Sequence, residues 1–294
     1  MDNATTEILV KDQCRQLRLP TVGARCMSVE QEAIRNHVSH SGYLSSLLEQ
    51  ELEDRGQRRA QRRIVEARFP QVKPLADFQF AQAPTISASQ IVGLAEGGYI
   101  ERGDNVLFVG DGGTGKTMLA TALGVAACRQ GRAVRFTTVA ALVNELLEAR
   151  DQQALSRVVA RWARVDLMIA DELGYVRLPP SGAELLFQVL ADRAERASVI
   201  VTTNLPFSEW TTVFPDPRLC KAVVERLTYR STIIETGTDS YRFKQSLARS
   251  QSRETESTKR TTQTRATVAA SAARSETPAT ADTNSNNHAG EPES

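Results

Sequence analysis

A glycine-rich segment in the first half of the chain constrains its fold more than any other feature. The segment LFVGDGGTGKTMLA covers residues 107–120 and has the spacing Gly110-x-x-x-x-Gly115-Lys116-Thr117 between two apolar runs. Glycines let successive backbone N–H groups point at one anion, and a helix that begins near Gly115 adds the positive end of its dipole. Lys116 then reaches the β- and γ-phosphates of a nucleotide, and the Thr117 hydroxyl holds Mg²⁺. The full match, between a strand pattern and a helix pattern, favours a phosphate-binding loop over a chance glycine turn.

Five short apolar runs predict β-strands, and amphipathic stretches between them predict helices. The runs are residues 105–110, 133–139, 165–172, 198–204 and 231–236. This alternation predicts an α/β fold with a mostly parallel five-stranded sheet between helices. Nucleotides bind at the carboxyl ends of the strands in such folds, so we expect a nucleotide there. The residues expected to contact it in the loop are Gly110, Asp111, Gly112, Gly113, Thr114, Gly115, Lys116, Thr117 and Met118.

Composition divides the chain into three regions. Residues 1–75 are charged and helical in pattern, and we expect this region to contact DNA or a partner protein. Residues 76–249 hold the predicted nucleotide-binding domain. Residues 250–294 contain no Leu, Ile or aromatic residue, so they cannot bury enough apolar surface to offset the entropy of ordering. We expect that tail to be disordered.

Bulk properties favour a soluble cytoplasmic protein. The 294 residues contain 36 Lys and Arg against 35 Asp and Glu, so only local charge clusters can indicate nucleic-acid binding. The four cysteines are widely spaced, as expected for reduced thiols. His37 and His40 have no cysteine or third histidine near them in the sequence, which argues against a metal site. We find neither a signal-peptide pattern nor an apolar run of the roughly 20 residues that span a bilayer, so no membrane partner is expected.

Two acidic residues end the third predicted strand. The segment VDLMIADELGY places Asp171 and Glu172 at the carboxyl edge of the sheet. There Asp171 would bind Mg²⁺ through its water shell, and Glu172 would orient or deprotonate the attacking water. Acids that merely cap the next turn are the alternative. A position 55 residues after Lys116 in a β/α alternation favours the catalytic interpretation, and with it hydrolysis over transfer of phosphate to a small molecule.

Two further side chains are candidates for the same reaction. Asn204 follows the fourth predicted strand, where it could sense the γ-phosphate and hold the lytic water; it could equally be a turn former before Pro206. Arg226 lies on an otherwise apolar helix face and could project into the nucleotide of a neighbouring subunit as an arginine finger. Pairing with Glu225 or another acid is the alternative, and Arg218 and Arg230 are rival fingers.

A cluster of arginines suggests a nucleic-acid contact. Five arginines and no acid occur between positions 55 and 63, and most of them share one helix face. Such a stripe could neutralise the phosphates of a duplex. A solvated helix with the pairs Glu51–Arg55 and Asp54–Arg58 fits the residues equally well. The candidate DNA contacts are Arg55, Arg58, Arg59, Arg62 and Arg63.

Five segments together resemble the IstB-like ATP-binding proteins. This family comprises helper ATPases of insertion-sequence transposition and is related to the DnaC and DnaI helicase loaders in the AAA+ superfamily. The resemblance runs from about Gly42 through Leu247, including RRIVEARFPQVKPLADFQF in the N-terminal region. The segments that carry it are DGGTGKTMLATALG, IADELGY, GAELLFQVL, TTNLPFSEW and DSYRFK.

The resemblance implies an AAA+ P-loop NTPase with a small helical N-terminal domain and no C-terminal lid. It implies the phosphate-loop pair Lys116 and Thr117, the Mg²⁺ and water pair Asp171 and Glu172, the sensor Asn204, the trans-acting finger Arg226 and a possible second sensor, Arg242. It also raises the expectation that the arginine stripe contacts DNA. The chain departs from the family pattern in two places. Glu precedes Arg226 where the family commonly has Asp, and a long Ser/Thr/Ala-rich tail follows Arg249.

Three functions remain compatible with these features. The first is a Mg²⁺-dependent ATPase that assembles on double-stranded DNA as a homo-oligomer and directs a transposase to its target. The second is a replicative helicase loader with the same ATPase core, since the N-terminal residues do not distinguish a transposase from a helicase. The third is a small-molecule phosphotransferase, which the predicted water-activating Glu172 disfavours.

Overall fold

The computed structural model describes residues 3–238 and residue 240. Five strands form one sheet in the order β2-β3-β4-β1-β5, and every neighbouring pair is parallel. The strands are β1 (Asn105–Val109), β2 (Val134–Thr138), β3 (Leu167–Leu173), β4 (Ser198–Thr203) and β5 (Ser231–Glu235). All five predicted strands and the predicted α/β architecture are confirmed.

Helices precede the sheet and connect its strands. Before β1 they are α1 (Asn3–Gln16), α2 (Pro20–Arg35), α3 (His40–Ala67), the 3₁₀ turns η1 (Leu75–Asp77) and η2 (Phe80–Gln82), α4 (Ala88–Ala95) and α5 (Gly98–Arg102). Between the strands they are α6 (Lys116–Arg129), α7 (Val139–Asp151), α8 (Leu155–Ala163), α9 (Pro180–Arg193), η3 (Phe207–Thr212) and α10 (Pro217–Thr228).

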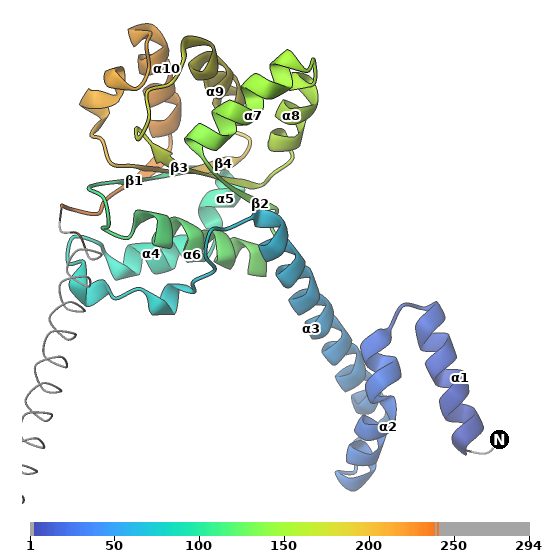
Figure 1. The fold of residues 1–294 in the computed structure, drawn as a ribbon. Helices are drawn as coiled ribbons and strands as arrows, with labels where there is room; N and C mark the ends of the chain where they lie inside the picture. The colour runs from blue at the N-terminus through green and yellow to red at the C-terminus, as the bar shows by residue number, and fades with distance from the viewer. Residues whose placement is uncertain (1–2, 239, 241–294) are drawn as a thin grey trace, which may run out of the picture. The chain divides into compact units, whose positions relative to one another are not determined.

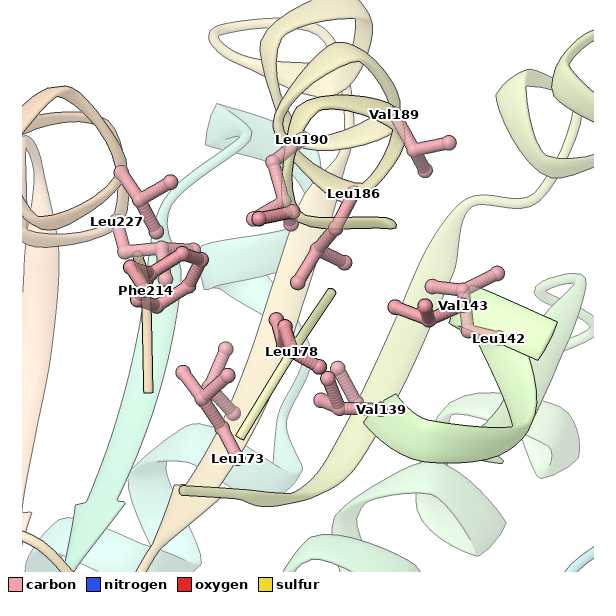
Figure 2. Close-up of a cluster of buried hydrophobic side chains, with 14 of the residues drawn as sticks. Val139, Leu142, Val143, Leu173, Leu178, Leu186, Val189, Leu190, Phe214 and Leu227 are labelled. Carbon is pink, nitrogen blue, oxygen red and sulfur yellow. The ribbon is translucent and has the colours of Figure 1, made fainter. Parts of the chain in front are cut away.

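The strands are buried on both faces, which explains why they appear as continuous apolar runs. Neighbouring residues of one strand pack into different cores: Leu107 lies in one cluster, whereas Val106 and Phe108 lie in the other. Helices α7 to α10 cover one face of the sheet, and α4 and α6 cover the other (Figure 1). Figure 2 shows the first core, in which side chains of α7, such as Leu142, and of α9, such as Leu186, converge over the sheet.

Parallel pairing brings the loops that carry the predicted chemistry to one edge of the sheet. The segments that leave the carboxyl ends of β1, β3 and β4 begin at Gly110, Gly174 and Asn204. Because β1 and β3 both pair with β4, these three exits are neighbours. The opposite edge is formed by the first residues of the strands, such as Asn105 and Ser231, which pair with each other.

The three N-terminal helices pack in sequence. Glu51 of α3 is buried, and its carboxylate accepts hydrogen bonds from the N–H groups of Thr21 (2.8 Å) and Val22 (3.2 Å) at the start of α2. The C-terminal end of α3 contacts the nucleotide-binding fold: the Arg135 guanidinium of β2 donates to the backbone carbonyl of Glu66 at 2.7 Å. The domain boundaries at residues 75 and 249 stay a prediction.

Several expectations fall on residues outside the described part of the chain. They are the disordered tail at 250–294, the missing lid after the last strand and the second sensor Arg242. Within the described residues, no helix combines the length and the apolar character needed to cross a membrane.

Candidate nucleotide-binding site

The predicted phosphate loop connects β1 to α6. Helix α6 begins at Lys116, directly after Gly115, as the sequence predicts. Gly115 has φ 96°, and a Cβ atom there would lie 2.7 Å from the ring of Phe78. A Cβ atom on Gly110 would lie 2.8 Å from the carbonyl oxygen of Gly237. Only glycine satisfies these two positions, because any side chain would meet atoms that already pack against the loop.

Lys116 and Thr114 hold the loop in its curled form. The Lys116 ammonium donates to the carbonyl oxygens of Gly110 (2.6 Å) and Asp111 (2.7 Å), and Lys116 is only 9% exposed. The buried Thr114 hydroxyl donates to the Asp111 carbonyl at 2.9 Å and shares a 2.7 Å hydrogen bond with the hydroxyl of Thr236, which follows β5. Thr114 therefore faces the protein interior and anchors the loop to the segment that follows β5.

The structure brings together the two residues predicted to hold Mg²⁺. The Thr117 hydroxyl lies 3.0 and 3.1 Å from the two carboxylate oxygens of Asp171, although 54 residues separate them. Mg²⁺ prefers oxygen ligands and is usually held by one or two protein groups, with phosphate and water completing the octahedron. In the part of the chain that the structure describes, no cluster of three or more His, Cys, Asp or Glu side chains could hold a metal ion. Thr117 and Asp171 thus fit a metal that is bound jointly with a nucleotide.

Glu172 lies at an irregular point of β3. Ala170 pairs with Val201 of β4, but the next pair is Leu173 with Thr203, so β3 contains one extra residue there. Glu172 has φ 62°, a left-handed conformation that is costly for a residue with a Cβ atom. Its side chain is exposed, whereas the neighbouring Asp171 is buried. The irregularity thus leaves Asp171, the predicted metal ligand, buried and Glu172, the predicted base, accessible.

Asn204 follows β4, as predicted, and lies beside the loop that leaves Glu172. A Cβ atom added to Gly174 would lie 3.4 Å from Asn204 Oδ1. This oxygen is buried and has no hydrogen-bond partner among the described residues. A buried acceptor without a partner is costly unless water or a ligand satisfies it. The position therefore favours the sensor interpretation over the turn former, and the role stays a prediction.

The sequence reasoning missed Thr202, a fully buried residue of β4. Its hydroxyl donates to Asp171 Oδ1 at 2.5 Å and accepts the backbone N–H of Glu172 at 3.0 Å. The hydroxyl run of VTTN, directly before Asn204, is the only signal in the sequence. That signal could be interpreted only with the knowledge that β4 is the neighbour of β3.

Arg226 does not join this group of residues. The amide of Asn105 donates to the Arg226 carbonyl oxygen at 3.3 Å, and Asn105 is the first residue of β1. Arg226 therefore lies at the amino-terminal edge of the sheet, about 13 Å along β1 from the strand's other end. Its guanidinium is 5.9 Å from the Phe187 ring centroid and 3.5 Å from the Ala191 carbonyl oxygen. No carboxylate within the described residues forms an ion pair with it, so the alternative pairing with Glu225 is not observed.

The rival finger residues occupy other places. Arg230 pairs with Asp104 at 3.2 Å, which occupies its guanidinium within the subunit. Arg218 is exposed at the first turn of α10, where its backbone N–H is capped by Asp216. Arg226 and Arg218 are both exposed, and neither forms an ion pair with a carboxylate in the described region, so both stay candidates.

The arginine stripe lies on α3, but its members have different surroundings. The expected Glu51–Arg55 pair forms at 2.8 Å. Instead of the expected Asp54–Arg58 pair, Asp54 accepts the hydroxyl of Thr21 and Arg58 donates to the Asp54 backbone carbonyl at 3.0 Å.

The last members of the stripe differ as well. Arg59 reaches the Gly131 carbonyl oxygen (3.5 Å), Arg62 is exposed, and Arg63 pairs with Glu66 (3.2 Å). Four of the five candidates share one surface, and Arg63 does not.

That surface is a groove between α1, α2 and α3, which we call the basic groove. Its volume is about 1140 Å³, and helix α1 contributes cations that the sequence reasoning did not single out. Lys11 and Arg15 of α1 also form exposed pairs with Glu7 and Asp12, which are weak contacts that a ligand can replace. The cationic residues that line the groove are Lys11, Arg15, Arg18, Arg55, Arg58, Arg59 and Arg62.

Comparison with known proteins supports the nucleotide site. Residues 12–249 match the IstB-like ATP-binding protein family. A protein of Sinorhizobium fredii, named as an insertion-sequence ATP-binding protein, is 37% identical over 243 residues, which are 82% of this chain and 80% of that protein. A Pseudomonas aeruginosa protein named for ATP binding and for insertion sequence IS21 is 34% identical over 230 residues, covering 78% of this chain and 87% of that protein.

Solved structures show similarity at lower identity. The DnaC helicase loader aligns with a TM-score of 0.47 and 21% identity, over 59% of this chain and 98% of that chain. DnaA from Aquifex aeolicus aligns with a TM-score of 0.49 and 18% identity, over 60% of this chain and 53% of that chain. The sheet order, the phosphate loop and the family match confirm an AAA+ P-loop fold. The chain belongs to the IstB-like family of insertion-sequence ATP-binding proteins.

Proposed function

We propose that the chain is a DNA-dependent ATPase that assembles on double-stranded DNA as a homo-oligomer and assists a transposase in target selection. One observation carries the ATPase part: Thr117, Asp171 and Glu172 meet at the sheet edge that also bears the phosphate loop. The insertion-sequence names of the relatives support transposition over helicase loading.

The side chains divide the work of hydrolysis among them. On nucleotide binding, Lys116 would exchange its loop carbonyls for the β- and γ-phosphate oxygens. Thr117 and Asp171 would hold Mg²⁺, which would supply positive charge to neutralise the developing phosphate charge. Glu172 accepts the proton of the attacking water as the oxygen of that water bonds to the γ-phosphorus and the bond to ADP breaks. Asn204 Oδ1 fixes the water by accepting its second proton in a hydrogen bond.

The variant Glu172→Gln tests the hydrolytic assignment. Its amide keeps the shape of the side chain but cannot accept a proton, so ATP and DNA binding should persist while hydrolysis is lost. Single-turnover hydrolysis and sedimentation of DNA complexes measure both properties, and assemblies should accumulate with ATP. Hydrolysis at the wild-type rate would remove Glu172 from the role of water-activating residue.

The basic groove carries the DNA part of the proposal. Replacing Arg58, Arg59 and Arg62 together by alanine should weaken binding to all duplex sequences alike, because phosphate contacts do not read bases. If each contacts one phosphate, the slope of log K against log salt should shrink by about 0.9 per residue. The matched control replaces the exposed Arg157, Arg164 and Arg196, which gives the same charge change outside the groove. If both triple variants gave the same slope, Arg58, Arg59 and Arg62 would not contact phosphates, and α3 would be a solvated helix.

The partner can be identified by co-assembly. The purified protein is mixed with ATP, target DNA and either the transposase of the same insertion sequence or the host replicative helicase. We expect a ternary complex with the transposase only. A complex with the helicase alone would replace the transposition proposal by the helicase-loader function.

A further inference from the structure

We propose that Thr202 is a positioning residue that sets the geometry of both carboxylates, Asp171 and Glu172, for ATP hydrolysis. The inference rests on the proposed ATPase function and adds a residue to it. Among the described residues, the Thr202 hydroxyl forms hydrogen bonds with neither the phosphate loop nor the exposed side chain of Glu172, so its effect is transmitted through its two neighbours on β3.

The first step concerns Asp171. Its Oδ1 accepts hydrogen bonds from Thr202 at 2.5 Å and from Thr117 at 3.0 Å, and the Thr117 hydroxyl also contacts Oδ2. A carboxylate can rotate about the last torsion of its side chain, and the hydrogen bond from Thr202 of the neighbouring strand β4 restricts this rotation. The Thr202 hydroxyl thus fixes the plane in which Asp171 would present its oxygens to a metal, as groups that hydrogen-bond to metal ligands do in metal sites.

The second step concerns Glu172 and the extra residue of β3. In an unbroken ladder Glu172 would pair with Thr203, but Leu173 takes that place and leaves the Glu172 N–H without a ladder partner. The Thr202 hydroxyl accepts this N–H at 3.0 Å. The left-handed Glu172 backbone, with φ 62°, is therefore held by a side chain of the neighbouring strand. Residues in such costly conformations persist only where their surroundings fix them.

The third step is that one hydroxyl group makes both contacts. A hydroxyl has a single hydrogen, and Thr202 uses it for Asp171 while its lone pair receives the Glu172 N–H. Thr202 is only 1% exposed, so water does not substitute easily for either contact. The same oxygen therefore couples the buried metal ligand to the backbone of the exposed base.

Three variants test the proposal in the full-length chain. Thr202→Val keeps the branched shape and removes the hydroxyl, Thr202→Ser keeps the hydroxyl, and Ser198→Ala removes a fully buried hydroxyl at the far end of the same strand. We expect Thr202→Val to lower kcat and raise the Mg²⁺ concentration for half-maximal rate, each by about 10- to 100-fold, with little change in KM for ATP. Thr202→Ser should restore both values, and Ser198→Ala should leave both at the wild-type level.

A second measurement does not depend on activity. Hydrogen–deuterium exchange of overlapping peptides that isolate the Glu172 amide should be faster in Thr202→Val than in Thr202→Ser, Ser198→Ala or the wild type. If the valine variant does not fold, Thr202→Cys, which is close in size and a poor hydrogen-bond donor, takes its place in both measurements.

The outcomes separate this inference from the proposed function. A wild-type protein without ATPase activity would contradict the proposed function, while the exchange measurement would still decide the role of Thr202. An active wild type with unchanged kinetics and unchanged exchange in Thr202→Val would overturn the inference. So would an equal loss of activity in Ser198→Ala, because the effect would then be a general loss of strand stability.

Discussion

Lys116 illustrates how a single side chain can have one set of partners before a nucleotide binds and another set afterwards. Its ammonium is buried and satisfied by the carbonyl oxygens of Gly110 and Asp111. A phosphate would offer charged acceptors, which form hydrogen bonds about twice as strong as neutral ones. The lysine is therefore available to a nucleotide without being an unpaired buried charge beforehand.

Removal of this cation should weaken ATP binding. We expect Lys116→Ala to lose about 1.5–3 kcal/mol of binding free energy, since a hydrogen bond to a charged group disappears. That loss corresponds to a dissociation constant about 10- to 100-fold higher, measured by isothermal titration calorimetry. Lys221→Ala, which removes an exposed lysine from α10, is the control. Unchanged affinity in a folded Lys116→Ala protein would contradict the assignment of the phosphate loop.

At the level of elements, α2 depends on α3 for its first turn. A helix begins with backbone N–H groups that have no partner within the helix. Leu19, the residue before α2, offers no side-chain cap, and Glu51 of α3 supplies the missing acceptor for Thr21 and Val22. Burial by itself would raise the pKa of the Glu51 carboxyl, but the Arg55 hydrogen bond and the two backbone N–H groups outweigh it and lower the pKa below 4.5.

This lowered pKa makes the α2–α3 contact sensitive to acid. A carboxyl whose pKa is lower in the folded state than in the unfolded state stabilises the fold at pH values above its unfolded-state pKa. This contribution is lost as the pH falls through the folded-state pKa. At pH values below about 4.5, the wild type should therefore lose more stability than Glu51→Gln, because the glutamine side chain has no charge to lose. At neutral pH we expect Glu51→Gln to be less stable by about 1–2 kcal/mol.

Chemical denaturation at several pH values, followed by circular dichroism, measures this effect. Glu53→Gln is the control, because Glu53 lies on the same helix and is exposed. Parallel stability curves for the wild type and Glu51→Gln from pH 7 to 3 would show that the contact does not stabilise the helices.

For the whole molecule, the proposed finger would act between subunits. Arg226 lies at the sheet edge opposite the phosphate loop, so we propose that it reaches the nucleotide of another subunit and not that of its own chain. We expect Arg226→Ala to bind ATP normally and to lose hydrolysis by about 10³-fold or more, as finger losses do.

Mixing two variants, at an ATP concentration too low to fill the weakened pocket of Lys116→Ala, gives the sharper test of this arrangement. Arg226→Ala supplies an intact pocket, and Lys116→Ala supplies an intact finger. Activity should partly return in mixed assemblies on DNA, measured as phosphate release. The absence of rescue in verified mixed assemblies would move the finger to Arg218 or Arg230, or exclude it.

Local sequence was sufficient for the elements and for the phosphate loop. Apolar runs and a fixed glycine spacing predicted all five strands and the start of α6, because these depend on backbone conformation and on short-range burial. Asp171 and Glu172 were located for the same reason, since they end a buried strand. The family resemblance added the IstB-like ATP-binding family, which the match over residues 12–249 confirms.

Contacts between distant segments could not be predicted in this way. Arg193 looks like a surface residue near the end of a helix, yet it is buried, donates to the carbonyl oxygens of Trp162 and Ser198, and has its pKa lowered to about 10 by burial. Glu51 matches an exposed helix pair in the sequence, and only the packing of α2 makes it a buried cap.

The sequence by itself therefore determined the five strands and the position of the phosphate loop, and it nominated the candidate nucleotide-binding residues. The tertiary structure decided which residues meet: Thr202 with Asp171, Thr114 with Thr236, and Arg226 with none of them. The physical reason is that strand order is set by packing of both sheet faces over the whole chain. Thr202 and Asp171 are 31 residues apart, and Thr114 and Thr236 are 122 residues apart, so the local sequence around each residue cannot predict these contacts.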